Sequence, residues 1–326
     1  MITVLCANAG IDKTYEVPNF APGGYYHPSS ATTSAGGKGV NVARALATLG
    51  QAHVIAGFAG GNNGRLIMRN LLDAGLQADL VSIAEESRIT ISIIDREQGT
   101  QTRVDEVGPL VTPGEIGRLR DTWRRSLQRS AMGIIAGSAP RGVTLELYAE
   151  LIEIAKSLKK PVMLDARDEL LARAVAARPT VITPNLNELQ RLVRRQLSVP
   201  EDVIKAATDL VESGIAVVAV TLGARGAIGM ARASGVWWAR PPAIERVSSV
   251  GSGDAFMAGF AVASMERRSF EEHLRLAVAC GAANAETAGA CVFDAARVRE
   301  IAAEVCLERL DGGDEQESAP EASKQA

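Results

Sequence analysis

Residues 251–254, Gly-Ser-Gly-Asp, combine a flexible turn with a carboxylate, and an almost wholly apolar segment follows them through Ala263. This pattern predicts a turn that opens a buried helix, with Asp254 in the first turn of that helix. The first N–H groups of a helix lack partners and lie at the positive end of its dipole, so they attract anions. An anion site beside a carboxylate that can accept a proton predicts phosphoryl transfer to a hydroxyl group.

The same four residues also have a purely structural interpretation. Asp is a favoured helix N-cap, and Gly-Ser-Gly is common in ordinary loops. The dinucleotide-binding fingerprint is not met, because Phe256 stands at its third glycine position. Taken alone, the turn does not separate a capped helix from a catalytic site.

A second glycine-rich turn, Gly36-Gly37-Lys38-Gly39, leads into a helix that is predicted to end at Gly50. The turn lacks the Walker pattern, because Lys38 is followed by Gly39 where that pattern has Ser or Thr. Lys38 and Asn41 could contact a polar ligand over bare backbone. A plain loop explains the turn equally well.

Strands and helices alternate along most of the chain and must position these turns. The predicted strands cover residues 2–8, 53–58, 75–81, 88–95, 100–106, 132–136, 161–165, 181–183, 216–222, 227–232 and 235–240. Beyond the helix that ends at Gly50, helices are predicted at 64–74, 113–131, 145–158, 169–177, 186–195, 201–213, 254–266, 270–287 and 294–309. Repeated β-α units require a mostly parallel sheet covered by helices on both faces. Asp12 follows the first strand, where open α/β sheets place ligand groups.

Two segments depart from this alternation. Residues 13–34 are rich in Pro, Gly and short polar stretches, and residues 87–106 have the pattern of a hairpin. We expect them to form a small β lid on a single domain that spans residues 1–310. Residues 311–326 are acidic and poor in apolar residues, which predicts a disordered tail.

Composition excludes several classes of protein. The 326-residue chain carries a net charge of −3, of which the tail contributes −4, so the remainder is close to neutral. No general field therefore attracts nucleic acid or an acidic membrane. The four cysteines and three histidines show no paired or metal-ligand spacing. No apolar run is long enough to span a bilayer and no signal peptide precedes the first strand, so a cytoplasmic location is expected.

Four motifs in order resemble the PfkB (ribokinase-like) carbohydrate kinases. The two glycine-rich turns, at residues 36–43 and 250–254, are similar to the two signatures of that family. Between them, residues 184–188 match its Asn-x-x-Glu element, and residues 221–226 resemble its nucleotide-binding turn. The resemblance implies a three-layer α/β/α sandwich with a mostly parallel central sheet and a small β lid.

Shorter segments are most similar to the branch that contains 1-phosphofructokinase and tagatose-6-phosphate kinase. These segments are residues 8–14, 87–90, 137–140 and 248–251. The branch implies an ATP- and Mg²⁺-dependent enzyme that phosphorylates a ketohexose already carrying one phosphate, such as fructose 1-phosphate or tagatose 6-phosphate, to a bisphosphate. It also implies a homodimer that forms through the lid.

The resemblance implies a role for each matching residue. Asp254 would be the general base, and the backbone of Gly251, Ser252 and Gly253 would form the anion hole. Sugar hydroxyls would be held by Asp12, Gly37 and Asn41, and the existing phosphate by Lys38, Arg88, Arg103 and Ser138. Asn185 and Glu188 would organise Mg²⁺ through water. The nucleotide would contact Asn185, Thr221, Gly223 and Gly226, with Ala283 and Asn284 near the adenine.

The chain departs from the family pattern at three places. Ser248 stands where the second signature commonly has Asp, and Thr183 stands where a lysine often reaches the ATP phosphates. Ala9-Gly10 replaces the usual Pro-Ala before Asp12. The Thr183 departure leaves one phosphate charge without a partner.

Two other hypotheses compete with the sugar-phosphate kinase. One is a ribokinase-like kinase for an unphosphorylated sugar or nucleoside, and burying Arg88 and Arg103 over a neutral sugar argues against it. The other is a sugar-phosphate-binding regulatory protein without turnover. The presence of Asp254, Asn185 and Glu188 argues against that hypothesis.

Overall fold

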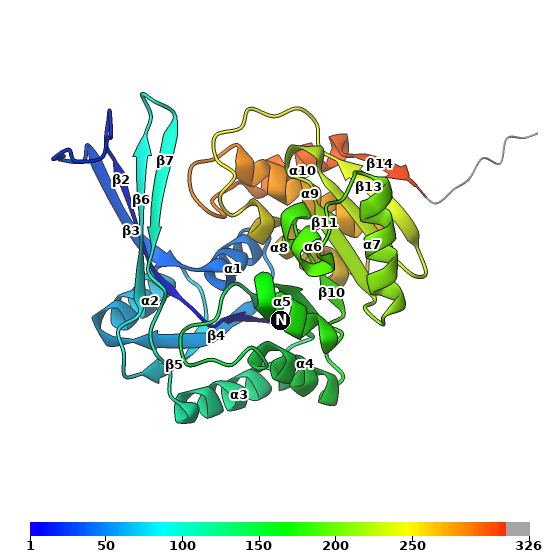
Figure 1. Cartoon of the computed structure of the whole chain (residues 1–326), viewed down its shortest axis with the longest axis horizontal. Helices are drawn as coiled ribbons and strands as arrows, with labels where there is room; N and C mark the ends of the chain where they lie inside the picture. Colours follow the sequence, from blue (N-terminus) through cyan, green and yellow to red (C-terminus); the bar gives the residue numbers. More distant parts are fainter. Residues whose placement is uncertain (311–326) are drawn as a thin grey trace, which may run out of the picture.

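The computed structural model describes residues 1–310, which form one large sheet covered by helices and a smaller sheet beside it (Figure 1). In spatial order the large sheet contains β14 (Cys306–Arg309), β13 (Gly235–Arg240), β12 (Ala227–Ala231), β11 (Val217–Thr221), β10 (Val181–Ile182), β9 (Val162–Asp165), β8 (Met132–Ala136), β1 (Ile2–Cys6), β4 (His53–Gly60) and β5 (Ala78–Ile83). Strands β11 through β5 in this order are parallel, and β12, β13 and β14 are antiparallel. The predicted three-layer α/β/α fold with a mostly parallel sheet is confirmed.

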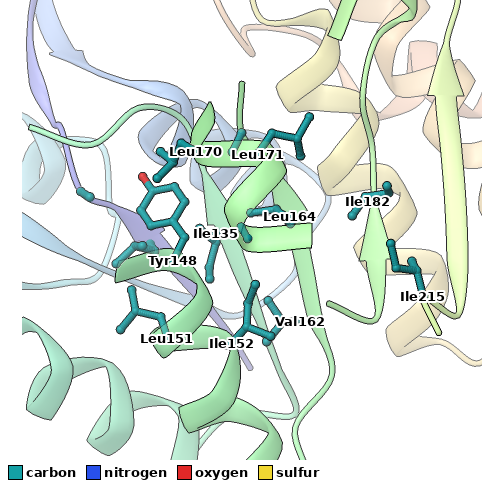
Figure 2. Close-up of a cluster of buried hydrophobic side chains, with 14 of the residues drawn as sticks. Ile135, Tyr148, Leu151, Ile152, Val162, Leu164, Leu170, Leu171, Ile182 and Ile215 are labelled. Carbon is teal, nitrogen blue, oxygen red and sulfur yellow. The ribbon is translucent and has the colours of Figure 1, made fainter. Parts of the chain in front are cut away.

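One face of the large sheet is covered by five helices. They are α3 (Pro113–Gln128), α4 (Leu147–Ser157), α5 (Asp168–Ala176), α6 (Leu186–Val193) and α7 (Glu201–Glu212). Figure 2 shows part of this layer, where Ile135 and Leu164 of the sheet meet Tyr148 and Leu151 of α4. The layer has an apolar core because β-α-β crossovers leave both faces of a parallel sheet buried.

The opposite face carries α1 (Lys38–Thr48), α2 (Gly61–Asp73), α8 (Ser252–Met265), α9 (Phe270–Ala285) and α10 (Ala295–Glu304). Helix α8 packs between α1 and α9, and every residue from Asp254 to Ala263 is buried. A helix that is apolar on all sides is stable only inside a protein, so the composition of α8 requires this central place. Burial within α8 thus begins at Asp254, whereas Ser252 and Gly253 before it are partly or fully exposed.

The smaller sheet has the strand order β3 (Ser30–Gly36), β2 (Gly10–Glu16), β6 (Arg88–Asp95) and β7 (Thr100–Asp105). It projects from the body on the side of β4 and β5 (Figure 1). Most of β3 and all of β7 are exposed. The two segments that the sequence assigned to a lid thus supply this sheet, and the lid function stays a prediction.

The prediction of one helix over residues 294–309 is wrong at its end. Helix α10 stops at Glu304, and β14 then pairs antiparallel with β13. The unpaired N–H and C=O groups at the edge of β13 favour this pairing, which sequence periodicity over so few residues does not reveal. The predicted acidic tail, residues 311–326, lies outside the described residues. Within residues 1–310, no helix is both long and apolar enough to cross a membrane.

Candidate active site

Asp254 lies in the first turn of α8 but does not cap this helix. The N-cap is Gly251, and no side chain caps this end of α8. Instead, Asn41 Nδ2 in α1 donates a hydrogen bond to Asp254 Oδ2 at 2.8 Å. The structural interpretation of Asp254 as a helix cap therefore does not account for its position.

The surroundings of Asp254 make it a weak acid. Only 5 % of the residue is exposed, and this burial is the main cause that raises the pKa of Asp254 to about 7. The Asp165 carboxylate adds to the rise, whereas the Lys38 ammonium and the Asn41 amide oppose it. A carboxylate with a pKa near 7 is suited to accept a proton at neutral pH.

The turn that precedes Asp254 is held by Asn284 of α9. The Asn284 amide donates to Val250 O at 2.9 Å and to Ser252 Oγ at 3.0 Å, and it accepts from Cys291 N at 2.7 Å. Gly251 has φ +85°, and a Cβ there would lie 2.8 Å from Ala290. Only glycine fits this position without displacing its neighbour.

Three expected site residues in and beside this turn stay predictions. Ala283 and Asn284, which were expected near the adenine, are 1 % and 0 % exposed. The contacts of Asn284 support the Gly251 turn. The N–H of Ser252, expected in the anion hole, donates to Ser249 O at 3.3 Å within the turn.

Lys38 is the first residue of α1 and pairs with Asp165 at the end of β9. Lys38 Nζ lies 2.8 and 2.9 Å from the two Asp165 oxygens. Burial opposes protonation of Lys38, but Asp165 and Asp254 outweigh it and raise its pKa above the ordinary value. The ammonium thus remains charged at physiological pH. The sugar-phosphate contact that the resemblance implies for Lys38 stays a prediction.

Sequence reasoning missed Asp165 as a site residue. Asp165 is 5 % exposed and ends strand β9, the same position relative to a buried strand that singled out Asp12. The signal was therefore present in the sequence. Arg44 was missed as well: its Nη1 donates to Asn41 Oδ1 at 3.2 Å, which directs the Asn41 amide nitrogen toward Asp254.

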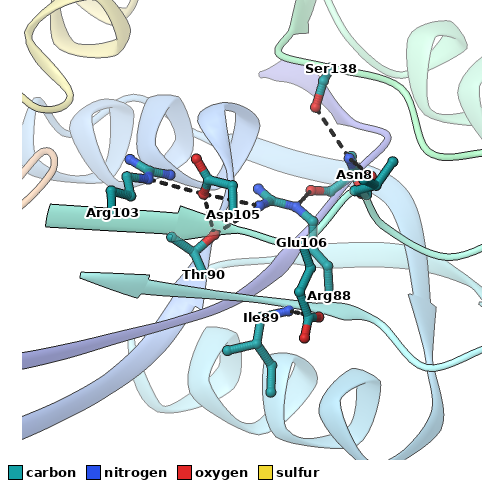
Figure 3. A network of polar contacts seen from close by, with 9 residues as sticks. Asn8, Arg88, Ile89, Thr90, Arg103, Asp105, Glu106 and Ser138 are labelled. Carbon is teal, nitrogen blue, oxygen red and sulfur yellow. Dashed lines mark hydrogen bonds and ion pairs between the residues drawn. The ribbon is translucent and has the colours of Figure 1, made fainter. Parts of the chain in front are cut away.

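Three of the four expected sugar-phosphate residues, Arg88, Arg103 and Ser138, join one polar network at the base of the smaller sheet (Figure 3), whereas Lys38 pairs with Asp165. Arg88 donates to Asn8 O at 3.0 Å and to Thr90 Oγ1 at 2.8 Å. Asn8 Nδ2 in turn donates to Ser138 Oγ at 3.2 Å. Arg103 donates to Asp105 Oδ1 at 3.0 Å, and Arg88 lies 3.7 Å from the same oxygen.

Asp12 has an unused acceptor. Its Oδ1 is buried and has no hydrogen-bond partner among the described residues. Burial raises the pKa of Asp12, although Arg103, Arg88 and Arg44 pull it down. A buried oxygen without a donor is costly, so this atom is suited to receive a ligand hydroxyl.

Apart from Ala283 and Asn284 of α9, the expected nucleotide and magnesium residues lie at or just beyond the ends of β10 and β11. Asn185 and Glu188 form a capping box on α6: Asn185 Oδ1 accepts from Glu188 N at 3.0 Å, and Glu188 Oε2 accepts from Asn185 N at 2.9 Å. This box explains the Asn-x-x-Glu spacing structurally. Asn185 pairs with Thr221, after which the Gly223–Arg225 turn begins.

Besides its bonds in the capping box, Glu188 interacts electrostatically with other charged side chains. Burial raises the pKa of Glu188, and the Asp165 carboxylate acts in the same direction. Glu188 and Lys38 attract each other electrostatically. Asp165, Glu188 and Asp254 each interact electrostatically with Lys38, but within residues 1–310 no three or more such side chains are grouped to hold a metal ion by themselves.

Comparison with known proteins shows which family the chain belongs to. The model of the pfkB family carbohydrate kinases matches residues 6–296. The chain belongs to the pfkB family of carbohydrate kinases. It is similar to 1-phosphofructokinase of Rhodobacter capsulatus, with 34 % identity over 85 % of this chain and 88 % of that protein. It is also similar to 1-phosphofructokinase of Escherichia coli K12, with 30 % identity over 93 % of this chain and 97 % of that protein.

Among solved structures, phosphofructokinase-2 of Escherichia coli in complex with fructose-6-phosphate has a TM-score of 0.85. Its identity is 28 %, and the match covers 93 % of this chain and 98 % of that structure. Membership in the pfkB family and these relatives confirm an ATP-dependent sugar kinase of the phosphofructokinase type. The family resemblance found in the four motifs is therefore confirmed.

A separate cavity of about 600 Å³ lies where the smaller sheet joins the body. Arg88 is the one predicted site residue in its lining, which otherwise includes Arg141 and the acids Glu85, Glu86 and Glu106. Asp254 does not line it. The cavity is therefore distinct from the space around the candidate base.

Proposed function

We propose that this kinase transfers the γ-phosphoryl group of ATP to a ketohexose phosphate, fructose 1-phosphate or tagatose 6-phosphate, to give the 1,6-bisphosphate. The observation that carries the proposal is the buried Asp254 carboxylate, whose pKa is about 7 and which lies at the N-terminus of α8 beside Lys38. A base and a positive helix end at one place are what phosphoryl transfer to a hydroxyl requires.

In the proposed mechanism, Asp254 accepts the proton of the attacking hydroxyl. The Asn41 amide holds the reacting carboxylate through its other oxygen, Oδ2. The backbone N–H groups at Gly251 and Gly253 and the Lys38 ammonium stabilise negative charge on the transferring group, because a helix N-terminus and a cation both favour anions. The buried Oδ1 of Asp12 receives a sugar hydroxyl.

Mg²⁺ would bind between the carboxylates near Lys38 and the ATP phosphates, because the side chains of residues 1–310 alone do not form a complete metal site. In kinases Mg²⁺ uses one or two carboxylates and the substrate phosphates, and it keeps several waters. Asp165 and Glu188 influence each other electrostatically, and Asn185 adjoins Glu188 through the capping box. These residues would hold the ion, which neutralises charge on the ATP phosphates when bound. Thr221, Gly223 and Gly226 would form the nucleotide contact beyond them.

Two arginines support a substrate that already carries a phosphate. Arg88 and Arg103 both influence Asp12 electrostatically, so they lie near the proposed sugar site. Asp105 favours the competing hypothesis of an unphosphorylated sugar, because it already pairs with both guanidinium groups. The exposed strands β3 and β7 support dimerisation through the smaller sheet, and a cytoplasmic homodimer stays a prediction.

The substrate is tested by measuring ADP release with fructose 1-phosphate, tagatose 6-phosphate and fructose 6-phosphate, and with fructose, ribose and adenosine as the unphosphorylated set. We expect turnover with fructose 1-phosphate or tagatose 6-phosphate. Activity restricted to the unphosphorylated set would make the proposed substrate class wrong. ATP binding without ADP release from any of the six compounds would favour a regulatory protein.

The pH dependence follows from the pKa of Asp254. Below a pH of about 7 the carboxyl is protonated and cannot accept a proton, so we expect kcat/KM to fall as the pH decreases from 8.5 to 5.5. Lys38 stays charged across this range because its pKa is raised. The sugar phosphate itself titrates near pH 6. If kcat/KM of the Asp254→Asn variant still falls at acidic pH, this fall would therefore reflect protonation of the sugar phosphate and not of residue 254.

Replacing Arg88 with Ala is expected to raise KM for the sugar phosphate by roughly 10–100-fold, the scale of a lost hydrogen bond to a charged group. KM for ATP should not change. Arg96→Ala is the matched control, because Arg96 follows β6 in the same sheet but pairs with Glu16. Equal sugar KM values in the two variants would remove Arg88 from the phosphate site.

A further inference from the structure

The turn after β11, residues 222–226, is exposed on one side and packs against β13 on the other. Gly223 and Ala224 are exposed, and a Cβ at Gly223 would meet no atom within 4 Å. On the other side, a Cβ at Gly226 would lie 1.9 Å from the carbonyl oxygen of Ala239 in β13. The turn therefore packs against β13 at Gly226, and its exposed residues lie on the side away from that strand.

Trp238 of β13 makes a second contact with the same turn. Its indole Nε1 donates to Arg225 O at 2.8 Å. The guanidinium carbon of Arg240 lies 3.8 Å from the centre of the Trp238 ring, and Arg240 pairs with Glu308 of β14. The Trp238 ring is therefore fixed by its hydrogen bond to the turn and by the Arg240 cation over the ring.

The turn itself depends on few other bonds. Leu222 N donates to Gly226 O at 2.8 Å, and Gly226 N donates to Gly223 O at 3.0 Å. Thr221 N donates to Pro184 O at 3.0 Å, which connects the turn to Asn185. Without the Trp238 bond, the Arg225 carbonyl would accept hydrogen bonds from water. The bond therefore adds little to the stability of the whole fold, and its main effect is to limit the conformations of the turn.

We propose that Trp238 is a positioning residue for the nucleotide: by holding the Arg225 carbonyl it keeps residues 222–226 in the shape that binds ATP. This inference rests on the proposed nucleotide contact at Gly223 and Gly226. Trp238 does not touch ATP in this scheme. Its effect is to reduce the conformational freedom that the turn loses when ATP binds.

The chain offers a matched control in the neighbouring residue. Trp237 lies on the opposite face of β13, and its Nε1 donates to Ser234 O at 2.9 Å in the β12–β13 turn. Arg309 lies over the Trp237 ring at 5.9 Å. Trp237 thus resembles Trp238 in chemistry and strand position but has no bond to the turn after β11.

The test compares Trp238→Phe with Trp237→Phe. We expect Trp238→Phe to raise KM for ATP, and its calorimetric Kd, by about 3–10-fold, the scale of one lost hydrogen bond. The sugar-phosphate KM and kcat should stay within about twofold. Trp237→Phe should leave all four values unchanged. If Trp238→Phe does not fold, Trp238→Tyr keeps a ring under Arg240 and removes the same donor.

Equal ATP affinity in the two variants would overturn the role of Trp238, as would an equal rise of both KM values in Trp238→Phe. Calorimetry with ATP alone measures ATP affinity without turnover, so it tests the role of Trp238 independently of the proposed sugar substrate. Weakened ATP binding in Trp238→Phe, with no turnover of any sugar phosphate by the unaltered protein, would support the inference and contradict the substrate. Unchanged ATP binding in Trp238→Phe, with normal turnover of a sugar phosphate by the unaltered protein, would contradict the inference and support the substrate.

Discussion

Replacing Asp254 with Asn is expected to lower kcat by roughly 10²–10⁴-fold, the usual scale for the loss of a general base. Asn has nearly the same shape, so the hydrogen-bonded position beside Asn41 can be kept. The amide cannot accept the proton of the attacking hydroxyl at any pH. Steady-state kinetics with saturating ATP and sugar phosphate measure the effect, and a near-normal kcat would show that Asp254 is not the base.

The same substitution should not destabilise the protein at pH 8. Because the folded-state pKa of Asp254 lies above its ordinary value of 3.8, the folded state binds this proton more tightly than the unfolded state. The linked contribution to stability is therefore present at acidic pH and is lost as the pH rises through about 7. A neutral Asn avoids that loss, so we expect Tm at pH 8 to be equal or higher.

Asp202→Asn is the matched control for Asp254→Asn. Asp202 also lies in the first turn of a helix, α7, but it is paired with Arg195 and the N–H of Ser198, and these bonds lower its pKa. A helix-dipole role predicts a small loss of stability and unchanged kcat. If both variants lost stability and neither lost kcat, Asp254 would be a structural carboxylate only.

Replacing Gly251 with Ala is expected to lower both stability and kcat. A residue other than glycine at φ +85° costs about 1–3 kcal/mol, and the new methyl would also press against Ala290 at 2.8 Å. Relief of this contact must move the turn that Asn284 holds. Because the turn presents the N–H groups of the proposed anion hole, we expect kcat to fall by about 10²–10³-fold.

Gly253→Ala separates the two effects. A Cβ at Gly253 meets no atom within 4 Å, and the residue lies in the first turn of α8 without a left-handed φ. Its free energy of unfolding should stay within about 1 kcal/mol of the unaltered protein. A Gly251→Ala protein with full kcat in the folded fraction would contradict the anion-hole role of the turn, whatever its Tm.

Local patterns in the sequence were sufficient for most of the fold. The apolar run after Asp254 predicted a buried helix, and the alternation of strands and helices predicted a mostly parallel sheet, both of which the structure confirms. The short strand β14 was missed because its pairing depends on the edge of β13, which is distant in sequence. Four motifs in order were enough to identify the pfkB family.

The sequence by itself determined which residues have the chemistry for the site, and that a glycine-rich turn precedes Asp254. Only the tertiary structure decided which groups surround Asp254. Asn41 is 213 residues away from Asp254, and Lys38 is 127 residues away from Asp165. These contacts exist because the crossovers of a parallel sheet bring the carboxyl ends of distant strands together. Burial, with the Asp165 carboxylate, raises the pKa of Asp254 to about 7 against the opposing effects of Lys38 and Asn41, and no local pattern encodes these surroundings.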